Sequence, residues 1–225
     1  MYRNSKWSAL AFILVIVIII LYLYPSESTE KSDSSMDNPT LSNKAVYIDS
    51  YLRNVSYYSA KNRMEESAVN IRKAIKTLKE LRLDVDVDSY ERLESSVRAL
   101  EDIYSSILYD SLEIQKMTSS FEFVLNNLAR TELEISEIYS ETNQIETAQI
   151  ALKYARVHVK NAILFHNMSD GANEGQLVIE QKVFQEMDSL LENNHISPID
   201  YTLTLDKMID EVDSLLKRSN SMIQH

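Results

Sequence analysis

The sequence predicts an all-α protein in which an N-terminal transmembrane helix precedes an elongated antiparallel helical bundle, or a short α-solenoid, of about six or seven helices. Turn-forming residues are scarce, since the 225 residues contain 2 glycines and 3 prolines against about 27 at average usage. An uncharged apolar run stands near the N-terminus, and beyond it apolar residues recur every three or four positions, as on one helix face. These observations leave little room for a sheet protein with many hairpins.

The scarcity of glycine and the lack of cysteine also exclude several kinds of site. Phosphate loops and dinucleotide-binding turns need glycine where the backbone approaches the ligand, and only 2 glycines are present. A chain with 0 cysteines has no disulfide framework, cysteine-ligated zinc, iron–sulfur cluster or thiol nucleophile. We therefore expect no cofactor.

Residues 7–24 form the predicted membrane anchor. They read WSALAFILVIVIIILYLY without a charge, and a helix of this length spans ~27 Å, close to the ~30 Å hydrocarbon core. Arg3 and Lys6 precede the run, so the positive-inside rule predicts a cytoplasmic tail over 1–6 and an extracytoplasmic location for the remaining chain. A cleaved signal peptide and the opposite orientation are the alternatives to this single-pass signal-anchor.

The chain beyond the apolar run is acidic. Residues 25–44 are rich in serine and acidic residues, which predicts a disordered stalk. All 34 acidic residues and 21 of the 23 basic ones lie beyond residue 24, a net charge of −13. Such a domain repels nucleic acid and anionic headgroups, so we expect neither as a ligand.

Residues 45–225 form the predicted helical domain. Apolar residues keep a three–four spacing from 89 to 142, which predicts either one long helix or two helices that meet near the serines of 118–120. A further helix is predicted over 144–167, and both glycines fall in an expected loop over 169–176. Another helix follows, and the last begins at Ser197-Pro198, with serine as the N-cap and proline in the first helical position.

Two segments resemble each other and suggest an internal repeat. YSAKNRMEES (58–67) and YSETNQIETA (139–148) share Tyr, Ser, Asn and Glu in register. We interpret Asn62 and Asn143 as N-caps, each with a glutamate three residues later that completes a capping box. A duplicated helical hairpin and two independent, well-capped turns predict this pattern equally.

Several groups of side chains were weighed as metal ligands. Asp84, Asp86 and Asp88 suggest a calcium loop, but glycine and the bidentate acid are missing from their required positions; the alternative is that Asp88 caps the next helix while the neighbouring valines pack inward. His158 and His166 are eight residues apart, about 12 Å along a helix, too far to bind one ion directly.

The remaining candidates are equally weak. Glu192-x-x-His195 matches half of a di-iron carboxylate motif, and no second half exists. Asn54 and Asn167 stand in glycosylation sequons, which are informative only if the domain is exported. Tyr57 begins a tyrosine pair that suggests a binding surface, although other tyrosines fall on core faces. We therefore predict no catalytic, cofactor-binding or metal residue.

These features together predict the class of function. A helical domain without a recognisable catalytic constellation, joined to a membrane anchor, predicts a non-enzymatic interaction or structural module on the outer face of the membrane, with a protein partner or a second copy of itself. The alternative is a ligand-sensing bundle that acts through a membrane partner. A metal-binding protein is the third hypothesis.

Overall fold

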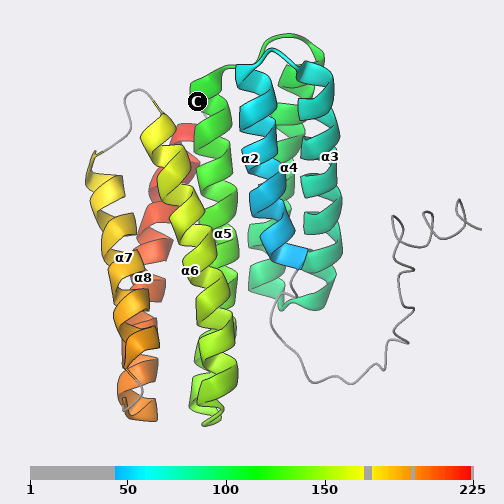
Figure 1. Ribbon diagram of the computed structural model, residues 1–225. Coiled ribbons are helices and arrows are strands. Elements are labelled where there is room, and N and C mark those ends of the chain that lie inside the picture. The colour runs from blue at the N-terminus through cyan, green and yellow to red at the C-terminus, as the bar shows by residue number, and fades with distance from the viewer. Residues whose placement is uncertain (1–43, 170–173, 194–195, 224–225) are drawn as a thin grey trace, which may run out of the picture. The chain divides into compact units, whose positions relative to one another are not determined.

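The computed structural model describes residues 44–169, 174–193 and 196–223, and the described residues confirm the all-α prediction. They form seven α-helices and one short 3-10 helix, without a strand (Figure 1). The elements are α2 (Lys44–Ala60), α3 (Met64–Leu81), η1 (Arg82–Asp84), α4 (Val87–Leu108), α5 (Ile114–Glu141), α6 (Ile145–Met168), α7 (Glu174–Glu192) and α8 (Pro198–Ile223). None of these helices has the length and apolar character needed to cross a membrane. The anchor predicted over 7–24 and the stalk up to residue 43 lie outside the described residues.

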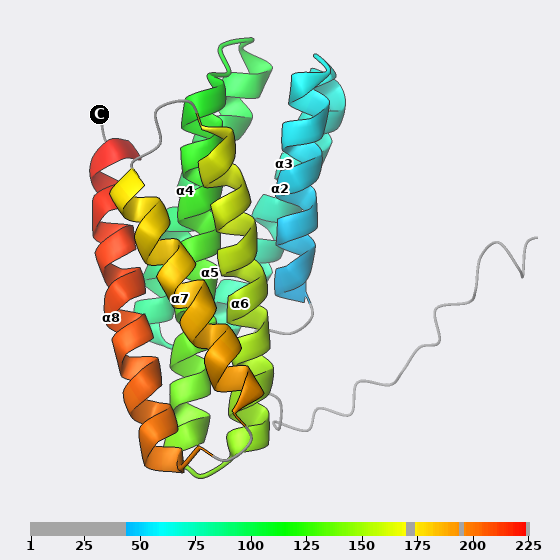
Figure 2. The same cartoon turned by 60° about the vertical axis from the view of Figure 1, so that its left-hand side comes forward.

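The helices form an antiparallel bundle around a central hairpin. Helices α5 and α6 pack against each other along their length, with α2, α3 and α4 on one side and α7 and α8 on the other (Figures 1 and 2). Consecutive helices run in opposite directions, as short connections require. Of the two predicted architectures, this arrangement is the helical bundle.

Two hydrophobic cores share the central hairpin. The first lies between α2, α3, α4 and the N-terminal half of α5, and it includes Phe165 of α6, whose ring meets Phe121 edge-on with centroids 5.2 Å apart. The second lies between the C-terminal half of α5, most of α6, and helices α7 and α8, with Tyr201 fully buried. Each fully buried large apolar side chain contributes roughly 1.5–3 kcal/mol to folding, so most of the stability lies in these cores.

The turn between α2 and α3 ends α2 with a residue in the left-handed region. Asn62 has φ 55°. Its N–H donates to the carbonyl oxygen of Ser59 at 2.9 Å, and the N–H of Arg63 donates to that of Tyr58 at 2.9 Å. This pair of bonds is the Schellman motif, in which asparagine is tolerated because its short polar side chain allows a positive φ.

The turn between α5 and α6 repeats this geometry. Asn143 has φ 59°, its N–H donates to Ser140 at 3.0 Å, and the N–H of Gln144 donates to Tyr139 at 2.8 Å. The capping-box interpretation of Asn62 and Asn143 is therefore wrong, because both close the preceding helix and the following N-caps make no side-chain cap bond. The shared Tyr-Ser-x-x-Asn letters encode one kind of helix end.

A third turn of this kind separates α4 from α5 over residues 109–113. Asp110 has φ 53°, and the N–H of Ser111 donates to the carbonyl oxygen of Ser106 at 2.9 Å. The predicted region 89–142 is thus two helices, as one alternative had it, but the break near 118–120 is wrong. Thr118 is buried inside α5, where its hydroxyl donates to the carbonyl oxygen four residues earlier at 3.0 Å.

The N-terminus of α4 shows what the aspartates after α3 do. Asp86 is the N-cap, and its carboxylate accepts the N–H groups of Asp88 at 2.9 Å and Ser89 at 3.0 Å. A capped helix start is therefore confirmed, but the capping residue is Asp86 rather than Asp88. Val87 is 74% exposed, so the prediction that it packs inward is wrong.

Helices α6 and α8 agree with prediction more closely. Helix α6 matches the predicted 144–167 to within a residue, and α8 begins at Pro198, with the hydroxyl of Ser197 accepting the N–H of Asp200 at 3.2 Å. One glycine was misplaced. Helix α7 begins at Glu174, so Gly175 lies in its first turn instead of in the loop.

Candidate functional site

Five buried polar side chains meet where α5, α6 and α7 adjoin, and we call them the α5–α7 cluster. The cluster consists of Glu122 and Asn126 from α5, His166 from α6, and Gln176 and Glu180 from α7. All five are at most 6% exposed. A buried charge is expensive unless it is paired, so this concentration of ionisable groups needs an explanation beyond packing.

Helical spacing explains how three separate segments build the cluster. Glu122 and Asn126 are four residues apart on α5, and Gln176 and Glu180 are four apart on α7, so each pair lies on one helix face. Helices α5 and α6 are antiparallel, which brings His166, near the end of α6, beside Glu122, near the start of α5.

The distances within the cluster are those of direct contacts. Nδ1 of His166 lies 3.3 Å from Oε1 of Glu122 and 3.9 Å from Oε2 of Glu180. The amide of Asn126 donates to Oε1 of Glu180 at 3.0 Å, and the amide of Gln176 donates to Oε1 of Glu122. One ligand atom from each of the two glutamates and the histidine lies within 4.8 Å of the others.

Burial dominates the electrostatics of the two glutamates. It raises the pKa of Glu122 to about 7, even though hydrogen bonds from Glu180 and Gln176 oppose the rise. It raises the pKa of Glu180 to about 9, because burial and the nearby charge of Glu122 outweigh the hydrogen bond from Asn126. Two carboxyl groups this close cannot both be ionised without a cation, so the pair holds a proton at neutral pH.

A second buried polar group joins α2, α5 and α6, and we call it the α2–α6 cluster. It consists of Asp49, Glu132, His158 and Asn161. Nδ1 of His158 lies 2.8 Å from Oδ2 of Asp49, and the amide of Asn161 donates to Oδ1 of the same carboxylate at 2.7 Å. Oδ1 of Asp49 therefore accepts a hydrogen bond, while Oδ2 lies at ion-pair distance from the imidazole of His158.

The charge state of His158 follows from its neighbours. Complete burial lowers the pKa of the imidazole, but the charge and hydrogen bond of Asp49 and the charge of Glu132 outweigh burial and raise the pKa above its ordinary value. His158 is thus the cation that pairs with Asp49, and Glu132 is a second carboxyl group near the same imidazole.

The structure separates the residues that the sequence had suggested as ligands. His158 and His166 lie in different clusters, as their spacing required. Asp86 caps a helix and is not part of a calcium loop. Glu192 is exposed at the end of α7, while His195 lies outside the described residues. The sequon residues are both exposed: Asn54 and Asn167.

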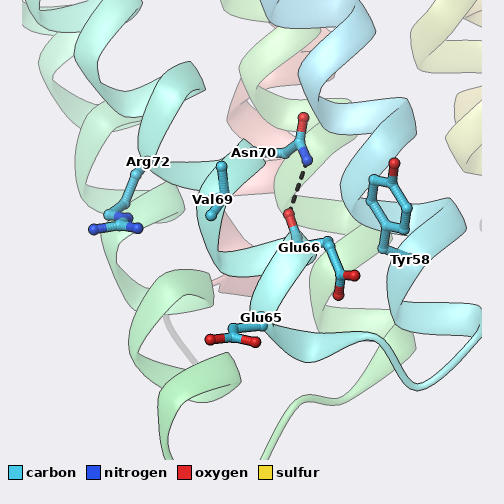
Figure 3. Close-up of a pocket in the computed structure, with 6 residues that line it drawn as sticks. All are labelled: Tyr58, Glu65, Glu66, Val69, Asn70 and Arg72. Carbon is cyan, nitrogen blue, oxygen red and sulfur yellow. Dashed lines mark hydrogen bonds between the residues drawn. The ribbon is translucent and has the colours of Figure 1, made fainter.

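The tyrosine surface is a shallow hollow rather than a built site. Tyr58 lines one side of a surface groove of about 330 Å³, and the other lining residues all come from α3 (Figure 3): Glu65, Glu66, Val69, Asn70 and Arg72. The amide of Asn70 donates to the backbone carbonyl oxygen of Glu66 at 2.8 Å, a bond within the helix. Tyr57 lies beside this groove and is 53% exposed.

No protein-family model matches the chain, and neither a curated protein nor a solved structure is significantly similar to it. Its function is therefore inferred from its own residues and their geometry. Among the described residues, the α5–α7 cluster is the group of His, Asp and Glu side chains whose ligand atoms converge closely enough to hold a metal ion.

Sequence reasoning missed this cluster. One signal was present, since Glu122 and Asn126 occupy positions of α5 beside the apolar residues that mark its core face. The partners on α6 and α7 gave no such signal, because a single histidine and a Gln-x-x-x-Glu pair are ordinary on an exposed helix face.

Proposed function

We propose that this chain is a membrane-tethered helical interaction module, anchored by residues 7–24 with its N-terminus in the cytoplasm and its helical domain over 45–225 outside. The observation that carries the proposal is the uncharged 18-residue run directly ahead of an acidic spacer and a helical domain. Such a domain would act by binding, through the exposed side chains of its helices.

Exposed apolar side chains on α6 supply a contact surface. Ile150, Leu164 and Met168 are 43%, 46% and 53% exposed. Their spacing of fourteen and four residues places them along one face of the helix. Apolar side chains aligned in this way favour contact with a partner.

Charge specifies the kind of partner. The net charge of −13 beyond residue 24 favours a protein with a basic surface in the same membrane and disfavours nucleic acid. Electrostatic association of this kind weakens as salt is added, because the Debye length falls to ~3 Å at 1 M.

The topology is tested with single cysteines, which the native chain lacks. Ser35→Cys and Ser5→Cys place one thiol on each side of the predicted anchor. With a membrane-impermeant maleimide on intact cells, we expect Ser35→Cys to react and Ser5→Cys to react only after permeabilisation. The reverse pattern would place the domain in the cytoplasm, and reaction of both variants on intact cells would exclude the anchor.

The contact surface is tested in the same membranes. Cross-linking from Leu164→Cys should give an adduct with a basic protein, and 1 M salt should abolish it. Asp102→Cys is the matched control, because it is an exposed position of α4, away from the apolar row of α6. Equal cross-linking from both positions would show that α6 has no specific contact surface.

A ligand-sensing bundle is the second candidate function. The specific observation in its favour is the α5–α7 cluster, whose two glutamates and one histidine are buried between three helices. The chemistry of that cluster limits the ligand to a cation.

A further inference from the structure

We propose that Glu122, His166 and Glu180 bind a divalent transition-metal ion, and that Zn²⁺ is the ion their donor atoms fit best. The proposed ligands are one carboxylate oxygen from each glutamate and Nδ1 of the histidine. This inference stands independently of the membrane tether, because it depends only on contacts inside the helical domain.

The separations of the donor atoms agree with tetrahedral coordination. Zinc binds nitrogen and oxygen at about 2.0–2.2 Å, so two ligands of a tetrahedral site are roughly 3.4 Å apart. Nδ1 of His166 lies 3.3 Å from Oε1 of Glu122 and 3.9 Å from Oε2 of Glu180. All three donor atoms lie within 4.8 Å of one another, so side-chain shifts of about 1 Å would bring them to three corners of the tetrahedron.

The charges also balance. Two carboxylates and a neutral imidazole neutralise a divalent ion, and the ion removes the repulsion between the glutamates that burial otherwise makes costly. The surroundings hold the donors in place, because Asn126 donates to Glu180 and Gln176 donates to Glu122. Such supporting bonds around the ligands are typical of metal sites.

An unused polar atom gives independent support. Among the described residues, Oδ1 of Asn126 is a buried acceptor without a hydrogen-bond partner. Rotation of the Asn126 amide would turn its oxygen toward the site as a further metal ligand, in place of its present hydrogen bond to Glu180. A buried oxygen that accepts no hydrogen bond is costly, and a bound cation would satisfy it.

The donor set discriminates between ions. Ca²⁺ requires six to eight oxygen ligands, and Mg²⁺ keeps several waters in an octahedral shell. A closed site with an imidazole nitrogen and two carboxylates suits neither. It suits zinc, and Mn²⁺ or Fe²⁺ would bind less tightly according to the general order of affinities.

The bound ion would hold α7 in place. In the first half of α7 the buried residues are Gln176 and Glu180, Ile179 packs partly against the second core, and the fully buried apolar residues begin at Val183. Attachment of this half therefore depends largely on the cluster. An ion coordinated by Glu180 would link α7 directly to α5 and α6. Metal binding would therefore change the surface of the domain by fixing the position of α7.

The experiment uses the full-length protein, purified in detergent and freed of metal with a chelator that is then removed. We expect one Zn²⁺ per chain by competition with a chromophoric chelator, with a Kd below about 1 μM. Co²⁺ in place of Zn²⁺ should give the intense visible absorption of tetrahedral coordination. Hydrogen exchange of the first half of α7 should slow on addition of Zn²⁺.

Two variants test the ligands. Glu180→Gln and His166→Gln should each weaken Zn²⁺ binding more than about 100-fold, beyond the usual effect of losing a residue that only supports a ligand. Glu180→Gln mimics the protonated carboxyl group, so the variant should keep its helical circular dichroism. The matched control is His195→Gln/His225→Gln, which removes two histidines that are not proposed ligands and should bind Zn²⁺ as the native chain does.

Any of three results overturns the proposal. The first is the absence of stoichiometric Zn²⁺ binding by the native chain, which would make the cluster a carboxyl pair balanced by a proton alone. The second is a folded Glu180→Gln variant that binds Zn²⁺ with native affinity. Loss of binding in the double-histidine control would likewise assign the ion to another place.

Discussion

The α5–α7 cluster and the α2–α6 cluster contain the same types of side chain but differ in their charge states. Each is buried between three helices, and each uses one glutamate of α5 and one histidine of α6: Glu122 with His166, and Glu132 with His158. In the α2–α6 cluster the histidine contacts Asp49 at 2.8 Å and has a raised pKa. In the α5–α7 cluster it is the two carboxyl groups that have raised pKa values.

The difference lies in where the neutralising charge comes from. His158 supplies the positive charge for Asp49 from within the chain, and Asn161 occupies the other oxygen of that carboxylate. Both clusters contain two carboxyl groups and one histidine, but in the α5–α7 cluster both carboxyl groups lie within 3.9 Å of the imidazole and both have raised pKa values, so protons or an added ion must balance them. A self-contained ion pair stabilises the fold, whereas a cluster that lacks a cation can respond to one.

The largest expected effect comes from breaking the self-contained pair. Asp49→Ala leaves His158 charged and buried without its partner, and the free energy of unfolding should fall by about 3–5 kcal/mol. Urea denaturation of the metal-free protein near pH 6 measures it. Glu101→Ala, which breaks the exposed pair with Lys79, is the control and should change stability by less than about 1 kcal/mol. Equal losses would show that the buried pair has no special role.

At the α5–α7 cluster we expect a substitution to raise the free energy of unfolding at high pH instead of lowering it. Burial raises the pKa of Glu180 to about 9, so the folded chain holds a proton that the unfolded chain releases above pH ~4.5. Metal-free native protein therefore loses stability as the pH rises toward 9. Glu180→Gln cannot ionise, so it should match the native protein near pH 5 and exceed it by on the order of 2 kcal/mol near pH 8.5. A Glu180→Gln variant that is less stable than the native protein at both pH values would contradict this prediction.

The pH dependence of His158 is the next smaller effect. Because its folded pKa is raised, the stability it contributes is complete below pH ~6.5 and is lost as the pH rises through the folded value. In a Glu180→Gln background this loss should appear as a decline in the free energy of unfolding above pH ~6.5. Adding His158→Gln should flatten the curve, as measured by thermal unfolding across the same pH range. A slope that survives in the double variant would assign it to other groups.

The smallest effect concerns the attachment of α7. Gln176→Ala removes one hydrogen bond to Glu122, worth about 1 kcal/mol, so amide hydrogen exchange in the first half of α7 should accelerate roughly fivefold. Exchange near His158 should stay unchanged. Gln181→Ala, an exposed position of the same helix, is the matched control, and acceleration by both variants would mean that α7 is held by its helical propensity alone.

The sequence predicts the helices better than it predicts their ends. Helix α6 and the start of α8 could be predicted because the apolar spacing is regular and Ser197-Pro198 marks a start. The break at Asp110 was missed, since a left-handed aspartate resembles any surface aspartate in the sequence. Asn62 and Asn143 were recognised as helix-end residues but assigned to the wrong helix, because asparagine suits both ends.

The clusters could not be predicted, for a reason of geometry. Glu132 was visible as a polar residue among apolar core positions of α5, which is a sign of a buried polar contact. Its neighbours, Asp49 and His158, come from helices far apart in the sequence, and only the packing of α2 beside α6 brings them together. Local spacing carries no information about such neighbours, whereas a capping serine acts within three residues.

The position of Asp49 determines how the domain carries a mechanical load. Any pull on the chain ahead of Lys44 enters the bundle at the first turn of α2, and Asp49 lies in the second turn. The first buried polar contacts under tension are therefore those of Asp49 with His158 and Asn161 on α6. These contacts transfer the force to the central hairpin before α2 separates from it. The buried ion pair would therefore also resist mechanical unfolding of α2.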